Sequence, residues 1–356
     1  MINVIGGGPA GSYASLLLAE KGFDVTVYED HEVIGVPIQC TGITTTFLER
    51  LVNIDEVLIN ETQRILVHSP QDSVEFSVKN LIFDRDRFDQ LLAKNAQAAG
   101  VQYRFNCRYT DHHLVFDKKK NVSHKLDGPI VGADGPRSKV AECVGMKGER
   151  SFLYGVQGVV KRKCDADVFE VWLGSMAPGL FAWSVPENKT ISRVGVACPK
   201  SSSIYFDSFL KRMGVEKKDI QCMQGGLIPI YNPALQTKKE NTYIIGDAAT
   251  HVKATTGGGI IPGMLAAQSL VKDIDGKKDY EWGWKKSIGR ELRMHLLIRT
   301  MLDKFSDNDY DQLIGMVKRE KVRSIIQHHD REFPIALAFD LLIHEPRFLT
   351  FAKHLF

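Results

Sequence analysis

A glycine-rich turn near the start of the chain limits the possible folds more than any other feature of the sequence. It lies between a short apolar run, residues 2–5, and residues 9–21, whose apolar side chains recur at helical spacing. Gly6, Gly8 and Gly11 have the spacing G-x-G-x-x-G. In a strand–turn–helix unit the first glycine permits a tight turn, the second lets the backbone approach a pyrophosphate, and the third lets the helix pack closely. The turn therefore predicts a dinucleotide site at the N-terminus of a helix.

A second strand and an acidic residue strengthen this interpretation. Residues 24–28 alternate as a β-strand and complete a βαβ unit, so we expect a parallel sheet. Glu29 follows 18 residues after Gly11, where a carboxylate can accept hydrogen bonds from the adenosine ribose. Ala10 opens the helix beside the phosphate. An ordinary glycine turn is the alternative, but the combined context favours a cofactor site.

Two later segments indicate FAD rather than NAD. Gly132-Ala-Asp-Gly135 follows one apolar strand, and Gly246-Asp247-Ala-Ala249 follows another. An aspartate after a strand can hold a ribityl hydroxyl, and the next helix N-terminus can face the flavin. That helix is expected to begin in the run Gly257, Gly258, Gly259, Ile260. A turn with an N-cap is the alternative for Gly246-Asp247 taken alone.

The order of predicted elements indicates an interleaved α/β protein with an α+β insertion. A Rossmann-like FAD-binding domain is expected from residues 1–60, 80–150 and 240–275. Residues 61–79 and 151–239 are rich in strands and predict a mostly antiparallel substrate domain. Residues 276–356 predict a helical C-terminal region.

Composition excludes several classes of protein. The chain has 356 residues, 44% hydrophobic and 25% charged, as in ordinary globular proteins. Its net charge of +3 is too small to indicate nucleic-acid binding. The six cysteines are scattered without a C-x-x-C pair, and we expect no metal site. No apolar stretch reaches the length of a membrane span, and the early strand leaves no room for a signal peptide.

Four segments together resemble the FAD-dependent family typified by para-hydroxybenzoate hydroxylase, and within it the geranylgeranyl reductase branch. Residues 35–42 (GVPIQCTG) are similar to the G-x-P-x-x-C segment of that branch, and residues 86–89 (DRFD) to its arginine-bearing helix start. Residues 246–260 are close to its flavin-binding signature. Residues 181–186 (FAWSVP) resemble its Y-x-W-x-F-P lipid-channel motif. The resemblance covers nearly the whole chain.

The resemblance implies an enzyme that reduces isolated C=C bonds in geranylgeranyl or related polyprenyl chains, such as those of archaeal-type ether lipids. Phe181, Val185 and Ala254 depart from the usual tyrosine, phenylalanine and proline. The first two departures fall in the expected lipid channel, so they bear on substrate specificity. The last should affect only a loop.

The resemblance also implies roles for individual residues. Cys40 would lie at the flavin, and Thr41, Gly42, Arg87 and Asp247 would bind the cofactor. The alternative for Cys40 is a small buried side chain. The substrate is expected to contact Phe181, Trp183 and Pro186, and also Trp172, where plain sheet core is the alternative. Positions 181, 183 and 185 share one face of a strand. His251, in the flavin loop, is assigned no role.

Three functions stay open at this stage. The first is the prenyl reductase. The second is a flavin monooxygenase acting on an aromatic or prenyl-quinone substrate, and the third is a prenyl-binding escort without FAD. The chain holds one complete dinucleotide fingerprint, so an external electron donor is expected: NAD(P)H, ferredoxin or a deazaflavin. We expect a cytoplasmic protein whose lipid substrate brings it to a membrane surface, and basic residues near Lys285 and Arg293 are candidates for that contact.

Overall fold

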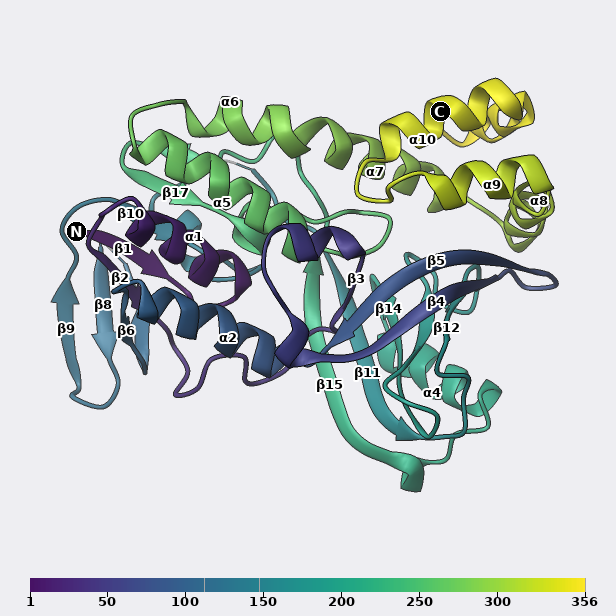
Figure 1. Ribbon diagram of the computed structural model, residues 1–356, viewed down its shortest axis with the longest axis horizontal. Coiled ribbons are helices and arrows are strands. Elements are labelled where there is room, and N and C mark those ends of the chain that lie inside the picture. The colour runs from purple at the N-terminus through teal and green to yellow at the C-terminus, as the bar shows by residue number, and fades with distance from the viewer. Residues whose placement is uncertain (112, 147, 356) are drawn as a thin grey trace. The chain divides into compact units, whose positions relative to one another are not determined.

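The computed structural model of the protein describes residues 1–111, 113–146 and 148–355 (Figure 1). Its residues divide into two units, each assembled from three stretches of sequence. The first unit contains Met1–Ile38, Arg85–Ser151 and Pro229–Arg293. The second contains Gln39–Asp84, Phe152–Ile228 and Met294–Phe356. Both units are therefore discontinuous in sequence.

The first unit is built on the parallel sheet that the glycine turn predicts. The six-stranded sheet has the order β16-β17-β10-β1-β2-β6, and all its pairs are parallel except that of β16 with β17. Every residue of β1 and β2 is buried, as expected for strands covered on both faces. The strands are β1 (Ile2–Ile5), β2 (Val25–Tyr28), β6 (Gln102–Arg104), β10 (Ile130–Gly132), β16 (Lys238–Lys239) and β17 (Thr242–Ile244).

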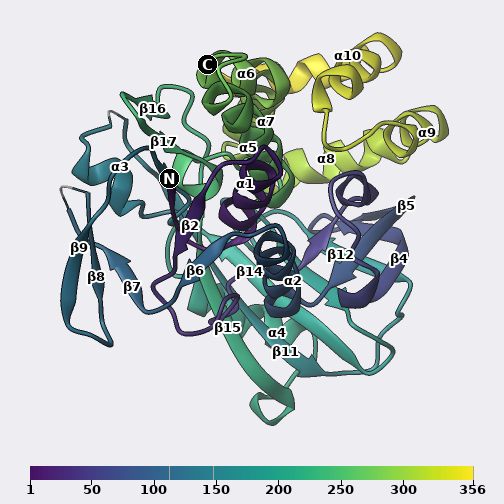
Figure 2. The same ribbon diagram turned by 60° about the vertical axis from the view of Figure 1, so that its left-hand side comes forward.

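Helix α1 is the central helix of the first unit, because it packs against both α2 and α5 (Figures 1 and 2). A smaller three-stranded sheet, β7-β8-β9, joins the same core, where Val115 and Leu126 pack with Ile5 and Ile130. The remaining elements of this unit are α1 (Pro9–Glu20), α2 (Arg85–Ala98), α3 (Lys139–Cys143), α5 (Ile260–Ile274), α6 (Tyr280–Trp284), β7 (Cys107–Tyr109), β8 (Leu114–Asp117) and β9 (Val122–Lys125).

The second unit contains an eight-stranded sheet in the order β15-β11-β14-β13-β12-β4-β5-β3. Strands β4 and β5 form an antiparallel hairpin around residues 64–78, and each strand is eleven residues long. The pairing of β12 with β4 is parallel, whereas β3–β5, β4–β5, β11–β14, β12–β13 and β13–β14 are antiparallel. The strands are β3 (Ile43–Thr44), β4 (Leu58–His68), β5 (Ser73–Phe83), β11 (Phe152–Lys161), β12 (Val168–Trp172), β13 (Ala182–Pro186), β14 (Ile191–Cys198) and β15 (Ile220–Pro229).

Helices cover the two faces of this sheet. On one face Phe206 and Phe209 of α4 (Ser202–Arg212) pack against Trp172. On the other face Val74 of β5 packs against Ile314 of α8. The faces differ because Trp172 is paired with His68, whereas Val74 is paired with the preceding residue of β4, and neighbouring strand residues point to opposite sides. The C-terminal helices are α7 (Arg290–Leu302), α8 (Asp307–Val317), α9 (Glu320–His328) and α10 (Pro334–His344).

The observed fold is the expected α/β class, with a Rossmann-type parallel sheet, a second sheet and a helical C-terminal region. Residues 276–356, expected to form a separate region, are divided between the two units after Arg293. The proposed three-part division of the chain therefore stays a prediction.

Gly195 on β14 is expected to be essential for the packing of the second sheet. A Cβ at this position would lie 2.4 Å from the ring of Trp183 and 2.6 Å from Cβ of Gln157. Gly195→Ala should therefore lower the free energy of unfolding by about 1–3 kcal/mol, measured by urea denaturation. Gly315→Ala on α8 is the control. No atom lies within 4 Å of its Cβ position, so this variant should raise the free energy of unfolding by about 0.5–1 kcal/mol.

Candidate functional site

The turn between β1 and α1 is shaped by two close backbone approaches. Gly6 has φ of +99°, and a Cβ there would lie 2.4 Å from the carbonyl oxygen of Ala133. A Cβ on Gly11 would lie 2.1 Å from the carbonyl oxygen of Gly6. Side chains at either position would push β1, β10 and α1 apart. These two glycines therefore have the tight-turn and close-packing roles that the fingerprint predicts.

Gly8 differs from its neighbours because nothing lies near it. No atom is found within 4 Å of its Cβ position, and its extended backbone (φ −69°, ψ −176°) is open to any residue. The protein itself does not require glycine here, whereas a pyrophosphate lying against the backbone does. The N-terminus of α1 begins at Pro9, directly after it. The geometry of this turn thus fits the diphosphate of FAD.

Glu29 is buried at the end of β2 and is held against the same turn. Its Oε2 accepts a hydrogen bond from the Gly7 N–H at 2.8 Å. Its Oε1 accepts from the backbone N–H of His31 at 3.0 Å and lies 2.6 Å from Nδ1 of that ring. The contact with His31 was not predicted, and only its position two residues after Glu29 hints at it. The carboxylate is therefore oriented at the place where a ribose would be recognised.

The Gly246–Asp247 segment meets the N-terminus of α1. The Cβ position of Gly246 lies 2.9 Å from Cβ of Ala10, and that of Gly263 on α5 lies 3.3 Å from the same atom. Two fingerprints far apart in sequence are therefore brought together by small residues. Because residues 246 and 263 are glycines, the end of β17 and helix α5 can both approach α1 this closely.

Asp247 lies against the start of α5. A Cβ at Gly259 would be 2.7 Å from its Oδ1, and Ile260 is the first residue of the helix. Burial raises the pKa of Asp247 to about 6, although the positive charge of Arg85 acts in the opposite direction. Gly257 has φ of +70° and donates its N–H to the carbonyl of Lys253, while Gly258 packs on that lysine side chain. The expected glycine run thus forms a tight loop before the helix.

The arginine directed into this region is Arg85 rather than Arg87. Arg85 forms two hydrogen bonds with Asp89, at 3.1 and 3.0 Å, and both side chains are largely buried. Arg87 lies on the exposed side of α2. Helical spacing could have revealed this, because positions 85, 88, 89 and 92 share one face and the last three are buried. Burial raises the pKa of Asp89, and the Arg85 charge opposes this shift.

Asp134 has a structural role in the first unit. It accepts hydrogen bonds from the Ser138 hydroxyl at 2.7 Å and from the Val140 N–H at 3.0 Å, at the start of α3. Asp134 therefore supports the N-cap residue Ser138 and the first turn of α3, while its neighbour Ala133 contacts the glycine turn.

His251, in the flavin loop, is fully buried beside the indole of Trp284, with ring centroids 4.6 Å apart. Neither ring nitrogen has a hydrogen-bond partner among the described residues. Burial lowers the pKa of His251 to about 3. The imidazole is therefore neutral near pH 7 and does not supply a proton there.

The Cys40–Thr41–Gly42 segment belongs to the second unit. Cys40 is half-buried, and its Sγ accepts the Gly42 N–H at 3.5 Å. The Thr41 hydroxyl donates to Oε1 of Gln157 at 2.8 Å, and its carbonyl accepts from the guanidinium of buried Arg193. The loop is therefore held by hydrogen bonds to both the side chain and the backbone carbonyl of Thr41.

Trp183 on β13 shares the same glutamine. Its indole N–H donates to Oε1 of Gln157 at 3.1 Å, and its ring lies over Gly195. Phe181 meets this ring edge-on, with centroids 6.0 Å apart, and Pro186 ends the strand. Gln157 was missed by the sequence analysis because nothing local to β11 shows that it faces both Thr41 and Trp183.

Trp172 does not join this group. It is paired with Ala182 on β13, one residue before Trp183, so the two indoles point to opposite faces of the sheet. Trp172 stacks on His68 at 4.6 Å and meets Phe209 of α4 at 4.9 Å. The structure therefore places it in the core beneath α4.

The described residues contain neither a cluster of metal ligands nor a membrane-spanning helix. Among them, no group of three or more His, Cys, Asp or Glu side chains could hold a metal ion. None of the helices formed by these residues has the length and apolar character needed to cross a membrane.

The parallel sheet, the glycine turn and the Asp247 loop define a flavoprotein oxidoreductase of the Rossmann type. A family model described as "FAD binding domain" matches residues 1–205. The chain belongs to this family, and its cofactor is FAD.

Similar proteins are found by sequence and by structure. A digeranylgeranylglycerophospholipid reductase of Methanothrix thermoacetophila is 27% identical, with 90% of this chain and 91% of that protein covered. A Thermoplasma acidophilum structure described as geranylgeranyl bacteriochlorophyll reductase-like has a TM-score of 0.86 at 20% identity, covering 100% of this chain and 98% of that chain. A probable FAD-dependent monooxygenase of Pseudomonas aeruginosa has a TM-score of 0.67 at 16% identity, covering 88% and 99%. Both structures have the same fold as this chain.

The open space beside Gly8 gives a direct test of the diphosphate site. Gly8→Ala should leave the unfolding free energy within about 0.5 kcal/mol of the parent, because the methyl group meets no protein atom. It should weaken FAD binding by at least about tenfold, since the methyl group would occupy the place of the pyrophosphate. Quenching of flavin fluorescence on titration into the apoprotein measures the affinity. Unchanged affinity would contradict this assignment.

Asp247 predicts a pH dependence of stability in the apoprotein. Its folded pKa of about 6 lies above the ordinary value of 3.8, so the folded state binds more protons between these values and stability falls as pH rises through them. Asp247→Asn removes this effect. At pH 7 the variant apoprotein should be more stable by about 1–3 kcal/mol, and the gain should vanish near pH 4. Urea denaturation at both pH values checks this, with FAD affinity expected to fall in the same variant.

Proposed function

We propose that this protein is an FAD-dependent reductase that saturates isolated C=C bonds in the geranylgeranyl chains of archaeal-type ether phospholipids. The observation that carries the proposal is the sequence match to curated reductases of that name, which extends over 90% of the chain. A match of this extent includes the Trp183 strand in the middle of the chain, and the FAD-binding family model covers the glycine turn. The geometry of each is consistent with the role proposed for it.

When bound in its reduced form, FAD would supply the hydride for one alkene carbon and would itself become oxidised, and a proton would complete the other carbon. The chain's own residues position the reactants. We assign the diphosphate to Gly6, Gly8, Ala10 and Gly11, with Glu29 at the ribose. Asp247 and the 257–260 loop would hold the flavin end, and Arg85 takes the role first expected of Arg87.

The prenyl chain is assigned to the face of β13 that bears Trp183, together with Phe181, which directly precedes the strand. Aromatic rings offer a large apolar surface without a charge to desolvate. The hydrogen bond from Trp183 to Gln157 fixes the ring and satisfies its only polar group. Trp172 is left out of this surface because it packs on the opposite face.

Cys40 is proposed to lie at the flavin, with Thr41 and Gly42 binding the cofactor. The support is the similarity of this segment to the reductase branch and the fixed geometry of the loop, where the Thr41 side chain and backbone carbonyl are both bonded. A Cys40→Ser enzyme with unchanged turnover and an unchanged flavin spectrum would contradict this role.

The electron donor is proposed to be external, one of NAD(P)H, ferredoxin or a deazaflavin. The chain has a single G-x-G-x-x-G turn, and that turn is assigned to FAD. Because the lipid substrate resides in a bilayer, peripheral contact with a membrane belongs to the same proposal.

A flavin monooxygenase is the second candidate, favoured by the shared fold with the Pseudomonas protein. An anaerobic experiment separates the two. The flavin is reduced with dithionite, excess reductant is removed, and a geranylgeranylated glycerophospholipid is added while oxidised-flavin absorbance is followed. Reoxidation by lipid without oxygen supports the reductase. Reoxidation only after air is admitted supports the monooxygenase, and a protein that binds no flavin would support the prenyl-binding escort.

Trp183 and Trp172 form a matched pair of test positions on opposite faces of one sheet. Trp183→Phe should slow lipid-driven reoxidation by about tenfold to a hundredfold with FAD affinity unchanged, because the ring loses the bond that orients it. Trp172→Phe should lower stability and leave that rate within about twofold of the parent. Pre-steady-state absorbance measures the rate. Equal effects of the two variants would exclude β13 as the substrate surface.

A further inference from the structure

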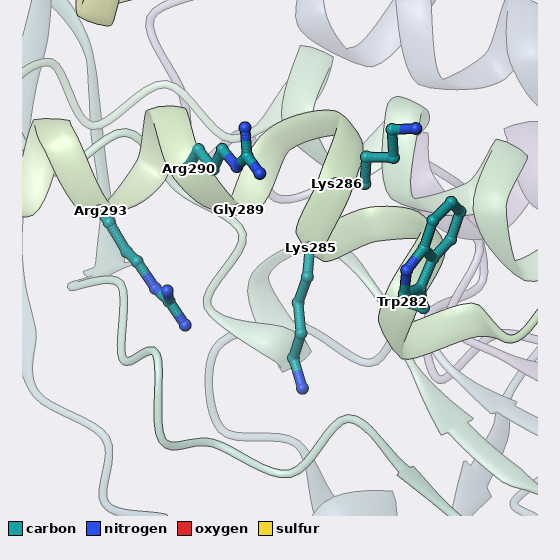
Figure 3. A pocket seen from close by; sticks show the side chains of 6 residues that line it. All are labelled: Trp282, Lys285, Lys286, Gly289, Arg290 and Arg293. Atoms are coloured by element: carbon teal, nitrogen blue, oxygen red, sulfur yellow. The ribbon is translucent and has the colours of Figure 1, made fainter.

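A basic hollow lies on the first unit, and none of its lining residues is among those assigned to FAD. It has a volume of about 480 Å³ and is lined by Trp282, Lys285, Lys286, Gly289, Arg290 and Arg293 (Figure 3). These residues come from α6, the π-helical turn Lys285–Gly289 and the first turn of α7. One continuous helical stretch therefore makes the whole lining.

The sequence spacing explains why the lining is shared. The six positions follow the pattern i, i+3, i+4, i+7, i+8, i+11, which places them on one side of a helix. Gly289, in the middle, also lines the hollow, and a Cβ there would lie 3.3 Å from the Trp284 ring and 3.4 Å from Cβ of Lys285. Figure 3 shows Lys285 and Arg293 extending to the same side of the helix, on either side of this glycine.

The hollow is strongly cationic. Four of its six lining residues are lysine or arginine. Among the described residues, only one of these four cations is paired with a carboxylate: Lys285 lies 2.7 Å from Glu281. Lys286, Arg290 and Arg293 are exposed and have no acidic partner there. Such a cluster attracts anions, and lysine or arginine is the usual partner of a phosphate.

Trp282 adds an apolar component to this surface. Its side chain is 48% exposed, and the ammonium groups of Lys278 and Lys286 lie 3.8 and 5.0 Å from its ring centroid. An exposed indole surrounded by cations is typical of the boundary between lipid headgroups and acyl chains, where tryptophan is enriched. A purely electrostatic contact with an acidic protein would not require the indole.

We propose that this hollow docks the protein on a membrane of anionic phospholipids, with the cations on the headgroup phosphates and Trp282 at the headgroup–acyl boundary. The inference extends the proposed function, because a lipid reductase must collect its substrate from a bilayer. Binding to a membrane needs no catalysis, so it is tested independently of the reaction.

The test is sedimentation of the FAD-loaded protein with vesicles of phosphatidylglycerol or of phosphatidylcholine alone. The parent should bind the anionic vesicles, and high salt should release it. Lys286→Glu/Arg290→Glu should weaken this partitioning at least about tenfold, since each basic side chain near an anionic surface contributes about fivefold. Both side chains are exposed, so the fold should be retained.

The control variant is Lys119→Glu/Lys120→Glu, which changes the net charge equally. These side chains are 65% and 74% exposed, after strand β8 and outside the hollow. The control should bind vesicles as the parent does. Trp282→Ala should weaken binding several-fold and leave the salt dependence in place. A control that loses binding as strongly as the pocket variant would reduce the effect to overall charge and overturn the proposal.

Other occupants give different results, and each would overturn it. Inorganic phosphate that stabilises the parent against heat but not the pocket variant, without vesicle binding, indicates a small-anion site. Loss of reduction by an acidic protein donor, with vesicle binding intact, indicates a docking site for that donor. Vesicle binding that survives in the pocket variant but is lost in Phe339→Asp assigns the contact to α10, where this side chain is 68% exposed.

The proposed function can fail without this inference failing. Turnover of a detergent-dispersed geranylgeranyl lipid should be equal in the parent and in Lys286→Glu/Arg290→Glu, whereas turnover of the same lipid in vesicles should fall with binding. If neither protein reduces any such lipid but the difference in vesicle binding persists, only the reductase assignment is contradicted.

Discussion

The first unit depends on how closely α1 approaches the strands beside it. The Cβ position of Gly11 is 2.1 Å from the Gly6 carbonyl oxygen, and that of Gly6 is 2.4 Å from the carbonyl oxygen of Ala133. Both distances are far shorter than van der Waals contact, so β1, β10 and α1 can approach this closely only if residues 6 and 11 are glycines. Once α1 is placed, Ala10 lies beside Gly246 and Gly263, and the Asp247 loop is brought to the same helix N-terminus. The site assigned to FAD is therefore a consequence of backbone contacts.

The second unit is organised around a buried polar group. Gln157 is almost fully buried, and burial without hydrogen bonds would be costly for its amide. The Thr41 hydroxyl and the Trp183 indole both donate to its oxygen, and its nitrogen donates to Gln224. Three strands and a loop are linked through one side chain. The same bonds that satisfy the glutamine orient the residues proposed to meet the substrate.

Local patterns predicted local structure well. The glycine turn and the βαβ unit both follow from spacing within a few residues, which is the range over which hydrophobic periodicity acts. The inward position of Arg85 could also have been predicted locally, because the buried positions of α2 define the face on which it lies.

The partners of Trp172 and Gln157 could not be predicted in this way. Whether Trp172 and Trp183 share a face depends on the register of β12 against β13, and a shift of one residue would reverse the answer. The hydrogen bond from the Thr41 hydroxyl to Gln157 joins residues 116 positions apart. Such contacts follow from strand order in an eight-stranded sheet, which no short window of sequence contains.

The two charged regions of the first unit illustrate opposite uses of burial. The Asp247 carboxyl is withdrawn from water, so its charged form is disfavoured until a donor reaches it. A ribityl hydroxyl would supply that donor. Cofactor binding would then also stabilise the charged form of Asp247, so the two effects are thermodynamically linked. Lys286 and Arg290 are exposed and stay hydrated, so their charges need no partner within the protein. The range of their attraction for anions is limited by the screening effect of salt. Burial therefore suits a permanent cofactor, and exposure suits a contact that must form and release.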